Sequence, residues 1–484
     1  MDATPPTAGD DGRPDAPGLT SPDDAAPPGA PASAPASPSA PLAPSRRSAA
    51  LGGASRAASR VASSTVAQRV RENLTDPVQV LAIVLIAAFA ARIVFLDLPH
   101  GALIFDEAYY VNAARKILGW VVPEGAHYWD AVAGLDPNQE HPPLGKVLMA
   151  LSMLVFGDNG IGWRLPSLVA GLTALVAVYL IVRAAGETRW LGVLAVGLLA
   201  FDNLALVHSR IGTLDMMVLA PALLAAWMSL KGRWLAAGAL VGVGMLFKLT
   251  ALYGLLALLV WAALMLLLEW RERRKVRLRD FRPFVSLVIA FAVVTLGGLW
   301  LLGMRFSAQP GPIAHLQHMI SYGANLKSSA GEPGSCPGID SAPWQWLVND
   351  CEINYLRVNV TVKAGETIVA QRATVDFRGA LNPILVGTMP LALLFAAWYA
   401  LRRGSRLAGW ALVWAGANWL PYVFLVAVSG RVTYLYYFLP VVPAIAVAVA
   451  LLLRRSGLHR AVAWGFVAVY LLGFLAYFPF RQIP

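Results

Sequence analysis

The sequence is poor in charged residues and in cysteine, and each shortage excludes a class of protein. Only 14% of the 484 residues are charged and 57% are apolar, which leaves too few polar side chains to cover a soluble protein of this length. The mean hydropathy is +0.58. Two cysteines without a histidine cluster make a poor metal site. No cofactor is expected, and the sequence does not determine whether the protein requires a metal. The composition therefore predicts an all-α polytopic membrane protein.

Long apolar segments are abundant, and about eleven of them are predicted to cross a bilayer as helices. They are residues 78–97, 164–183, 190–207, 213–230, 234–250, 251–269, 283–304, 383–401, 407–428, 437–453 and 461–479. The apolar run Val147–Phe156 is shorter, about ten residues, and is predicted to be an interfacial helix because it cannot span. The stretch 234–269 is interrupted by Lys248, where two helices are expected to turn.

The formal charge of +11 is explained by membrane topology and does not predict a nucleic-acid partner. Five short turns on one side contain 17 Lys and Arg residues, whereas three short turns on the other side contain only Arg210, Lys248 and Arg431. Because cytoplasmic loops are enriched in Lys and Arg, the N-terminus is predicted to be cytoplasmic and the C-terminus to lie outside the plasma membrane.

The first 72 residues are rich in Ala, Pro, Ser and Gly. Such a segment cannot bury enough apolar surface to fold, so residues 1–72 are predicted to be a disordered cytoplasmic tail. The segment lacks the basic start and short apolar core of a cleavable signal peptide, and the first helix is expected to act as the export signal. Residues 73–484 are then the transmembrane domain.

Two large loops, 98–163 and 305–382, fall on the outer side, and function is expected there. The second loop contains Cys336 and Cys351, for which a disulfide is favoured over two free thiols because the loop faces away from the reducing cytosol. Residues 355–362 and 367–375 flank a turn and are predicted to form a β-hairpin.

An acid pair, Asp106–Glu107, follows the first span and precedes an amphipathic helical spacing. One interpretation is an N-cap, because carboxylates are favoured at helix starts. The other is a catalytic carboxylate at the membrane surface, and Asp106 could serve in both ways.

Five cations are placed to meet a lipid phosphate on the outer side. Arg210, Lys248 and Arg431 lie in short outer turns, and Lys146 and Arg164 lie at the end of the first outer loop. Cations at this depth suit an anionic ligand. Snorkelling side chains at helix ends are the alternative for each residue.

Three further features have a physical interpretation. Asp215 lies inside a predicted span and needs a partner, for which Arg210 is the candidate. His141 precedes two prolines that fix an extended turn, so it is expected to shape the loop or contact an acceptor rather than catalyse. The tyrosines at 434, 436 and 437 are interpreted as an aromatic belt in preference to a donor groove.

Several of these residues occur in the order found in a known family. They are Phe105-Asp106-Glu107, His141 to Lys146, Arg164, Ser209-Arg210 with Leu214-Asp215, and Asn382-Pro383. Together they resemble the protein O-mannosyltransferases of the bacterial type, over roughly residues 80–450. The match is specific in the first outer loop and weak in the later spans.

This resemblance implies a GT-C glycosyltransferase that moves mannose from a polyprenyl phosphate onto Ser or Thr hydroxyls of exported proteins, with inversion, at the outer face of the cell membrane. It implies that Asp106 is the general base, that Glu107 and Arg164 support the catalytic centre, and that the donor lipid and the Sec translocon are partners. The remaining predicted substrate-binding residues are His141, Lys146, Arg164, Arg210, Asp215, Lys248 and Arg431.

Two other functions fit the same residues. A GT-C enzyme could transfer mannose, arabinose or another sugar to a lipid or cell-wall glycan with the same carboxylate and cations. A transporter for a polyprenyl-linked substrate is the second alternative, but transporters usually show internal repeats and broken midplane helices, and the sequence has no convincing repeat.

Overall fold

The computed structural model describes residues 76–327, 336, 339–364 and 367–481, which all belong to one compact unit, Arg69–Pro484. Within β1 and β2 it describes the backbone alone for residues 360–373. The tail predicted for residues 1–72 lies outside the described residues.

Each of the eleven predicted spans contains a helix. The helices are α2 (Pro77–Ile93), α5 (Gly160–Ala184), α6 (Arg189–Ala200) with α7 (Asn203–His208), α8 (Asp215–Leu230), α9 (Trp234–Met245), α10 (Ala251–Arg273), α11 (Arg282–Phe306), α13 (Pro383–Arg403), α14 (Arg406–Ser429), α15 (Val442–Arg455) and α16 (Arg460–Ala476). Among the described residues, six helical segments are long and apolar enough to cross a membrane. The chain is therefore a multi-pass membrane protein, and eleven crossings remain a prediction.

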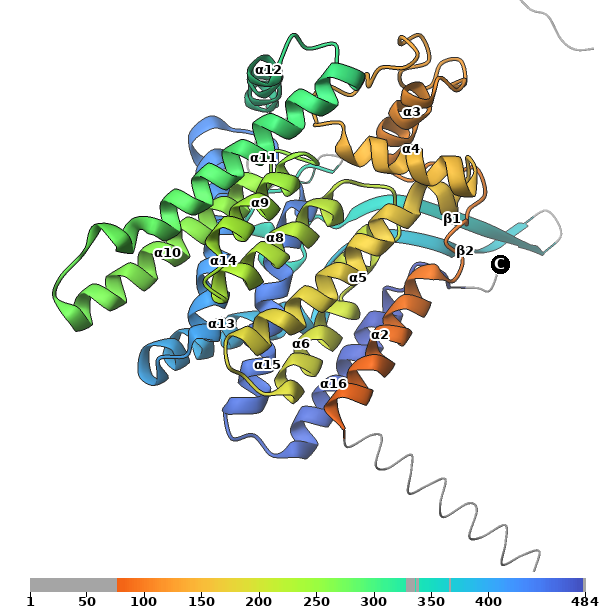
Figure 1. Cartoon of the computed structure of the whole chain (residues 1–484). Helices are drawn as coiled ribbons and strands as arrows, with labels where there is room; N and C mark the ends of the chain where they lie inside the picture. The colour runs from red at the N-terminus through yellow and green to blue at the C-terminus, as the bar shows by residue number, and fades with distance from the viewer. Residues whose placement is uncertain (1–75, 328–335, 337–338, 365–366, 482–484) are drawn as a thin grey trace, which may run out of the picture. The chain divides into compact units, whose positions relative to one another are not determined.

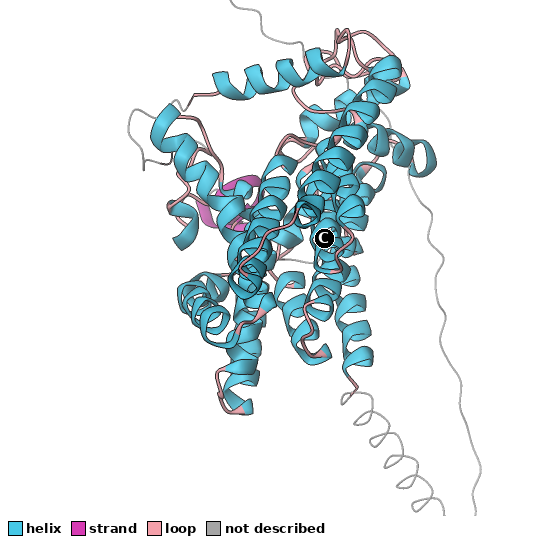
Figure 2. Cartoon of the chain, turned by 60° about the vertical axis from the view of Figure 1, so that its left-hand side comes forward, coloured by secondary structure: helices cyan, strands magenta, loops and turns pink. Residues whose placement is uncertain are grey.

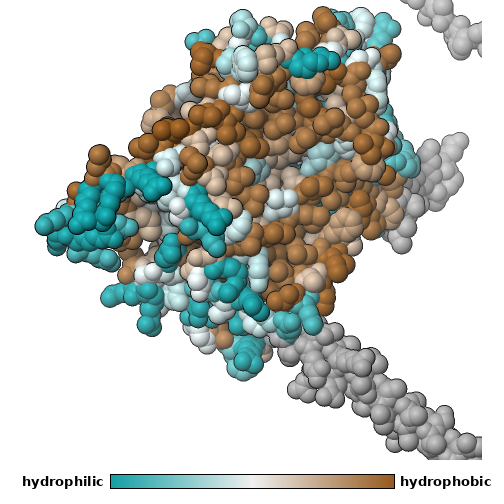
Figure 3. Space-filling model, viewed as in Figure 1, coloured by the Kyte–Doolittle hydropathy of each residue, from teal (hydrophilic) through white to brown (hydrophobic). Residues whose placement is uncertain are grey.

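The surface divides by polarity along the helices. Figure 3 shows a broad hydrophobic region over the helices, with hydrophilic residues gathered at the lower left, where α10 ends, and at the bottom. Figure 1 shows that α3 and α4 lie at the opposite end from this polar region. A broad apolar surface along the helices is what contact with the hydrocarbon core of a bilayer requires.

Short polar side chains define where the helices begin. Asn159 Oδ1 accepts hydrogen bonds from the first amides of α5, those of Ile161 and Gly162, at 3.0 and 3.1 Å. Thr188 and Ser405 cap α6 and α14 in the same way. Such caps satisfy amides that have no partner within the helix.

One predicted span, 190–207, is two helices instead of one. Asp202 ends α6 and caps α7, because one carboxylate oxygen accepts from Ala205 N at 2.9 Å and the other from Asn382 N at 2.9 Å. Asn382 in turn donates to the carbonyl of Tyr470 in α16 at 3.0 Å. The Asn382–Pro383 element thus joins α7, α13 and α16, and it has a structural role.

The end of the bundle opposite the basic turns is covered by shorter elements. They are α3 (Glu107–Leu118), α4 (Leu144–Phe156), α12 (Pro312–Asn325) and the antiparallel strands β1 (Ile353–Ala364) and β2 (Thr367–Gly379). The predicted hairpin is therefore present, and α4 contains the run that was expected to be an interfacial helix. Figures 1 and 2 show these elements at one end of the long helices.

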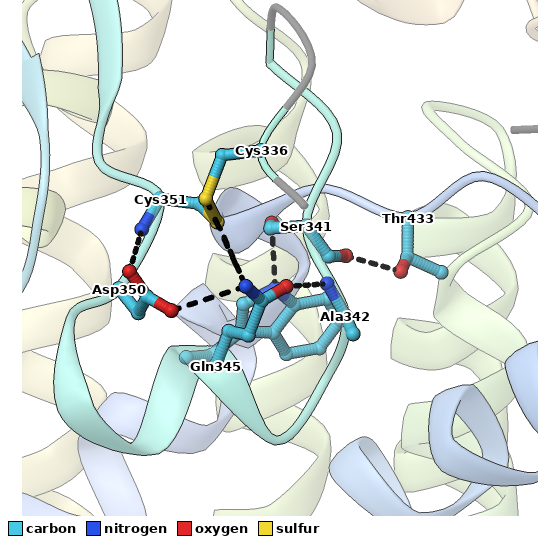
Figure 4. Close-up of a disulfide and its surroundings, with 8 residues drawn as sticks. Cys336, Ser341, Ala342, Gln345, Asp350, Cys351 and Thr433 are labelled. Atoms are coloured by element: carbon cyan, nitrogen blue, oxygen red, sulfur yellow. Dashed lines mark hydrogen bonds between the residues drawn. A yellow bond between two sulfur atoms is a disulfide. The ribbon is translucent and has the colours of Figure 1, made fainter. Parts of the chain in front are cut away.

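Cys336 and Cys351 form a disulfide whose Cα atoms are 5.4 Å apart (Figure 4). Gln345 lies beside it and donates to Asp350 Oδ2 at 3.1 Å. The neighbouring Trp346 is fully buried and packs against Tyr422 and Phe438. The disulfide therefore closes a compact loop that is anchored on the helices by Trp346.

Candidate active site

Asp106 occupies the N-cap position of α3, but its side chain makes no capping hydrogen bond. The capping interpretation is therefore wrong for this carboxylate. The Tyr110 hydroxyl, one helical turn further along, lies near the Asp106 carboxylate and interacts with it. Asp106 is half-buried and retains some exposure, so a substrate hydroxyl can reach it.

Glu107 performs the anchoring role. Its carboxylate accepts from Ile104 N at 2.7 Å and Gly212 N at 2.7 Å, and from Arg164 at 2.8 and 3.0 Å. Glu107 and Arg164 are both fully buried. Because these four hydrogen bonds occupy its acceptor sites, Glu107 holds the loop in place and has no free oxygen for a proton.

Besides Glu107, Arg164 binds the loop that leads into α3. Its guanidinium donates to the carbonyls of Leu96, Leu98 and Ala102 at 2.7, 3.0 and 3.0 Å. A planar guanidinium with five donors suits such a convergent set of acceptors. Arg164 is thus a supporting residue, as the family resemblance implies, and it has no donor directed at a phosphate.

The residue before Asp106 adopts an unusual backbone conformation. Phe105 has φ of 56°, a left-handed value that costs a non-glycine residue about 1–3 kcal/mol. Its ring packs on Tyr355 of β1 at 4.6 Å and on Tyr436 at 5.7 Å. These contacts hold the strained turn, and the turn fixes the direction of the Asp106 side chain.

Gly212, whose amide binds the Glu107 carboxylate, lies where there is little space for a side chain. A Cβ at this position would lie 3.1 Å from the Trp163 carbonyl oxygen and 3.4 Å from Glu107 Cγ. A larger residue would therefore push the Gly212 amide away from the Glu107 carboxylate.

Asp215 is paired with Lys248 instead of Arg210, which corrects the sequence prediction. Lys248 Nζ lies 2.9 Å from Asp215 Oδ1, and His208 Nδ1 lies 3.7 Å from Oδ2. His208 Nε2 shares a 2.8 Å hydrogen bond with the Tyr355 hydroxyl. The pairing puts the ammonium group of Lys248 near Asp106, with which it interacts electrostatically.

Arg210 is buried against helix α2 and binds no group in the site. It donates to the carbonyls of Ala91 and, at 2.6 Å, Val94. These are carbonyls of the last turn of α2, where the helix dipole favours a cation. Its guanidinium also lies 5.1 Å from the ring centre of Phe480. Arg210 is therefore not placed as a phosphate ligand.

The ammonium group of Lys146 is likewise occupied by partners within the protein. It forms an ion pair with Asp136 at 2.7 Å and donates to Asn138 Oδ1 and the His141 carbonyl at 3.1 and 2.8 Å. Lys146 is completely buried. Asp136 and Asn138 were missed by the sequence argument, although both precede the His-Pro-Pro motif by a few residues. The cluster closes the loop and shapes the position of His141.

His141 lies beside Tyr110, with ring centres 5.8 Å apart. Burial, together with Lys248 and Lys146, lowers the pKa of His141 well below its usual value, so the ring is neutral. Its Nδ1 is buried and has no hydrogen-bond partner among the described residues. The uncharged ring of His141 thus lies beside Tyr110, and its Nδ1 keeps an unused hydrogen-bonding position.

Arg431 is the predicted cation whose guanidinium remains available. Its guanidinium makes no hydrogen bond or ion pair with a residue that the structure describes, and its Nε is buried without a partner. It lies within electrostatic range of Tyr253, Tyr422 and Tyr437. Lys248, which lies 5.8 Å from the Tyr437 ring centre, flanks the same tyrosine. Arg431 and Lys248 therefore define a cationic region around Tyr437.

The tyrosine cluster is an interior element, so the interpretation as an aromatic belt is wrong. Tyr436 and Tyr437 are only 5% and 9% exposed. The rings of Tyr434 and Tyr436 are stacked at 5.4 Å, and Lys248 lies 5.2 Å from the Tyr436 ring centre. Lipid-facing residues would be exposed at the outer ends of the helices.

Burial, together with the nearby Asp215, raises the pKa of the Asp106 carboxyl to about 7, although Lys248 and the Tyr110 hydroxyl oppose the shift. A carboxylate with a pKa near the working pH is suited to accept a proton. The site thus brings together the Asp106 carboxyl, the neutral ring of His141, the Lys248–Asp215 ion pair and the guanidinium of Arg431.

Comparison with known proteins identifies similar sequences. Residues 140–300 match the model of the dolichyl-phosphate-mannose-protein mannosyltransferase family. The chain is 26% identical, over 443 residues, to the polyprenol-phosphate-mannose–protein mannosyltransferase of Corynebacterium glutamicum, covering 76% of this chain and 81% of that one. It is 33% identical over 135 residues to the enzyme of the same name from Mycolicibacterium smegmatis, covering 27% of this chain and 25% of that one.

Two solved structures share the fold. The Saccharomyces cerevisiae Pmt1–Pmt2 complex bound to the sugar donor aligns with a TM-score of 0.59 and 11% identity, covering 83% of this chain and 89% of that one. ArnT from Cupriavidus metallidurans bound to undecaprenyl phosphate aligns with a TM-score of 0.51 and 20% identity, covering 80% of this chain and 62% of that one. The chain therefore has the GT-C fold.

Proposed function

We propose that this chain, which belongs to the protein O-mannosyltransferase family, transfers mannose from a polyprenyl phosphate to Ser or Thr hydroxyls of proteins, with inversion at the sugar. The observation that carries the proposal is Asp106. Its half-buried carboxylate has a pKa near 7 and stands on a strained turn that Glu107 and Arg164 hold rigidly.

The reaction needs a single displacement. The acceptor hydroxyl oxygen attacks the anomeric carbon of the sugar while Asp106 accepts the hydroxyl proton. The bond between the anomeric carbon and the phosphate oxygen breaks, and its electron pair leaves with the lipid phosphate. One base suffices, because the departing phosphate is already a stable anion at neutral pH.

Arg431 and Lys248 are proposed to hold the donor phosphate. The guanidinium of Arg431 has no hydrogen-bond partner among the described residues, and its fork matches phosphate oxygens. Lys248 is oriented by Asp215 at 2.9 Å and lies near the ring of Tyr437. Fixed cations of this kind stabilise the negative charge that grows on the leaving group.

His141 is proposed to contact the acceptor or the sugar. Its ring is neutral and its Nδ1 has no partner among the residues described, so it can exchange a hydrogen bond with a hydroxyl group. Lys146 fixes the turn that carries it, since Lys146 donates to the His141 carbonyl at 2.8 Å. His141 positions a substrate, whereas Asp106 moves the proton.

The reaction is proposed to occur on the extracytoplasmic face of the plasma membrane. The support is the distribution of basic residues, which gather in the turns at the end of the helices opposite α3 and α4. Acceptors would then be exported proteins, encountered as they leave the Sec translocon.

The test is transfer of labelled mannose from polyprenyl-phosphate-mannose to a Ser/Thr/Pro-rich peptide by the purified full chain. Asp106→Asn removes the proposed base, and Asp130→Asn changes an exposed carboxylate of the same loop as a matched control. Transfer that Asp106→Asn abolishes and Asp130→Asn preserves would support the proposal. Transfer only to a lipid or glycan would show that the acceptor is not a protein. If Asp106→Asn is as active as the wild type, Asp106 is not the general base.

A further inference from the structure

A concave surface with no residue of the Asp106 site in its lining lies between α2, α6, α15 and α16. Figure 1 shows these four helices, with α2 and α16 at the lower right. The surface is a groove of about 800 Å³, within the range of about 300–1,000 Å³ that is typical of ligand sites. Its floor is apolar and buried, as shown by Leu198 and Tyr470, each 2% exposed. Its rim opens sideways, where Trp464 is 69% exposed.

The groove has the length of one membrane leaflet. Its lining follows α6 from Trp190 to Phe201, a distance of about 16 Å at 1.5 Å per residue. Half of the hydrocarbon core of a bilayer is about 15 Å. A single acyl chain of a leaflet lipid therefore matches the groove, whereas a polyprenyl chain would extend well beyond it.

One end of the groove is cationic. Arg454 and Arg460 line it, are exposed, and form no ion pair with a residue that the structure describes. The adjacent Arg455 differs, because it is paired with Glu187. Trp190 and Trp464 line the same groove, and tryptophan is favoured at the level of lipid headgroups.

The floor of the groove contains an open position at Gly197. A Cβ built on Gly197 would meet no heavy atom within 4 Å, so the backbone of α6 lies directly beneath free space. In a bilayer such an apolar space at the side of the protein is filled by lipid, because an empty cavity forfeits dispersion contacts.

We infer that this groove binds one anionic phospholipid, with an acyl chain along α6 and the phosphate between Arg454 and Arg460. Two exposed arginines at the mouth of an apolar groove complement this headgroup and favour it over a zwitterionic one. The bound lipid fills the space beside α16, which packs on α13, and so keeps α16 on the bundle. The site is independent of the proposed transfer reaction.

The experiment is native mass spectrometry of the delipidated full chain titrated with phosphatidylglycerol or phosphatidylcholine of identical acyl chains. The wild type should bind phosphatidylglycerol at least tenfold more tightly. Arg454→Ala combined with Arg460→Ala should remove this preference, because each basic residue near a headgroup contributes to binding. Gly197→Phe should weaken both lipids by filling the groove.

Matched controls separate the site from general effects. Arg402→Ala combined with Arg403→Ala removes two exposed cations from the end of α13, and Gly465→Phe adds a ring at a position of α16 that does not line the groove. Both should bind like the wild type. Equal binding of the two phospholipids by the wild type, or unchanged binding by Gly197→Phe, would overturn the inference. The arginine variant changes only exposed side chains, so it decides the matter even when Gly197→Phe does not fold.

Discussion

Replacing Asp106 by Asn has opposite consequences for activity and stability, and both follow from its surroundings. The amide has nearly the same shape, but it cannot accept the acceptor's proton. General acid–base catalysis contributes about 10²–10⁴-fold to a rate, so kcat should fall by about that factor. KM for the lipid donor should stay within about threefold of the wild type, because Arg431 and Lys248 remain in place.

The stability effect comes from the raised pKa of Asp106, from 3.8 to about 7. Between these two values the folded chain binds more protons than the unfolded chain, so wild-type stability falls as the pH rises through this window. The pKa rises by about 3, and each pKa unit corresponds to 1.36 kcal/mol. Above pH 7 the charged Asp106 carboxylate therefore lowers the free energy of unfolding by at most about 4 kcal/mol. Asp106→Asn lacks this cost and should be the more stable protein at pH 8.

Two measurements check this reasoning. Mannose transfer to a peptide gives kcat and KM, and a thermal-unfolding series in detergent from pH 5 to pH 8 gives the stability difference. The difference in stability between Asp106→Asn and the wild type should become smaller towards pH 5, where the wild-type carboxyl is protonated. The reasoning fails when Asp106→Asn keeps more than a tenth of the wild-type kcat, or when it is less stable than the wild type at pH 8. Asp130→Asn should change neither quantity.

Three further outcomes are expected. Wild-type kcat/KM should rise about tenfold per pH unit below pH 7 and level off above it, as Asp106 loses its proton. Arg431→Ala should raise KM for the donor by about tenfold or more with little change in unfolding temperature, because its guanidinium has no partner among the described residues. Lys146→Met should destabilise the protein by about 3–5 kcal/mol by leaving Asp136 buried and unpaired, and Asp136→Leu in the same chain should restore most of the loss.

Each of these outcomes has a contrary result. If kcat/KM does not change between pH 5 and pH 8, the reaction rate does not depend on the protonation of Asp106. A stability loss in Arg431→Ala without a change in KM would make Arg431 structural, and Arg406→Ala serves as the control arginine. The variant with both Lys146→Met and Asp136→Leu could prove no more stable than Lys146→Met alone. The destabilisation would then have a cause other than the loss of the Lys146–Asp136 ion pair. Unfolding temperature and donor KM distinguish these cases.

The family resemblance located the loop that carries the site, but it could not assign the roles within the acid pair. Asp106 and Glu107 are adjacent, and either carboxylate could cap α3 or accept a proton. Their difference depends on Arg164 and Gly212, which are 57 and 105 residues from Glu107 along the chain. Those partners saturate Glu107 and leave Asp106 accessible.

The sequence by itself determined where the helices and the hairpin lie, because hydrophobic length and strand patterning are local properties. The eleven apolar segments and the strands were located this way, whereas the break at Asp202, the 3₁₀ helix that precedes α15 and the helix α12 in the second outer loop were missed. Tertiary structure alone decided the partners of the charged residues. Arg210 binds carbonyls more than a hundred residues away in α2, and Lys248 binds Asp215 across two helices. A buried charge takes the partner that packing brings within reach, and sequence distance does not reveal that partner.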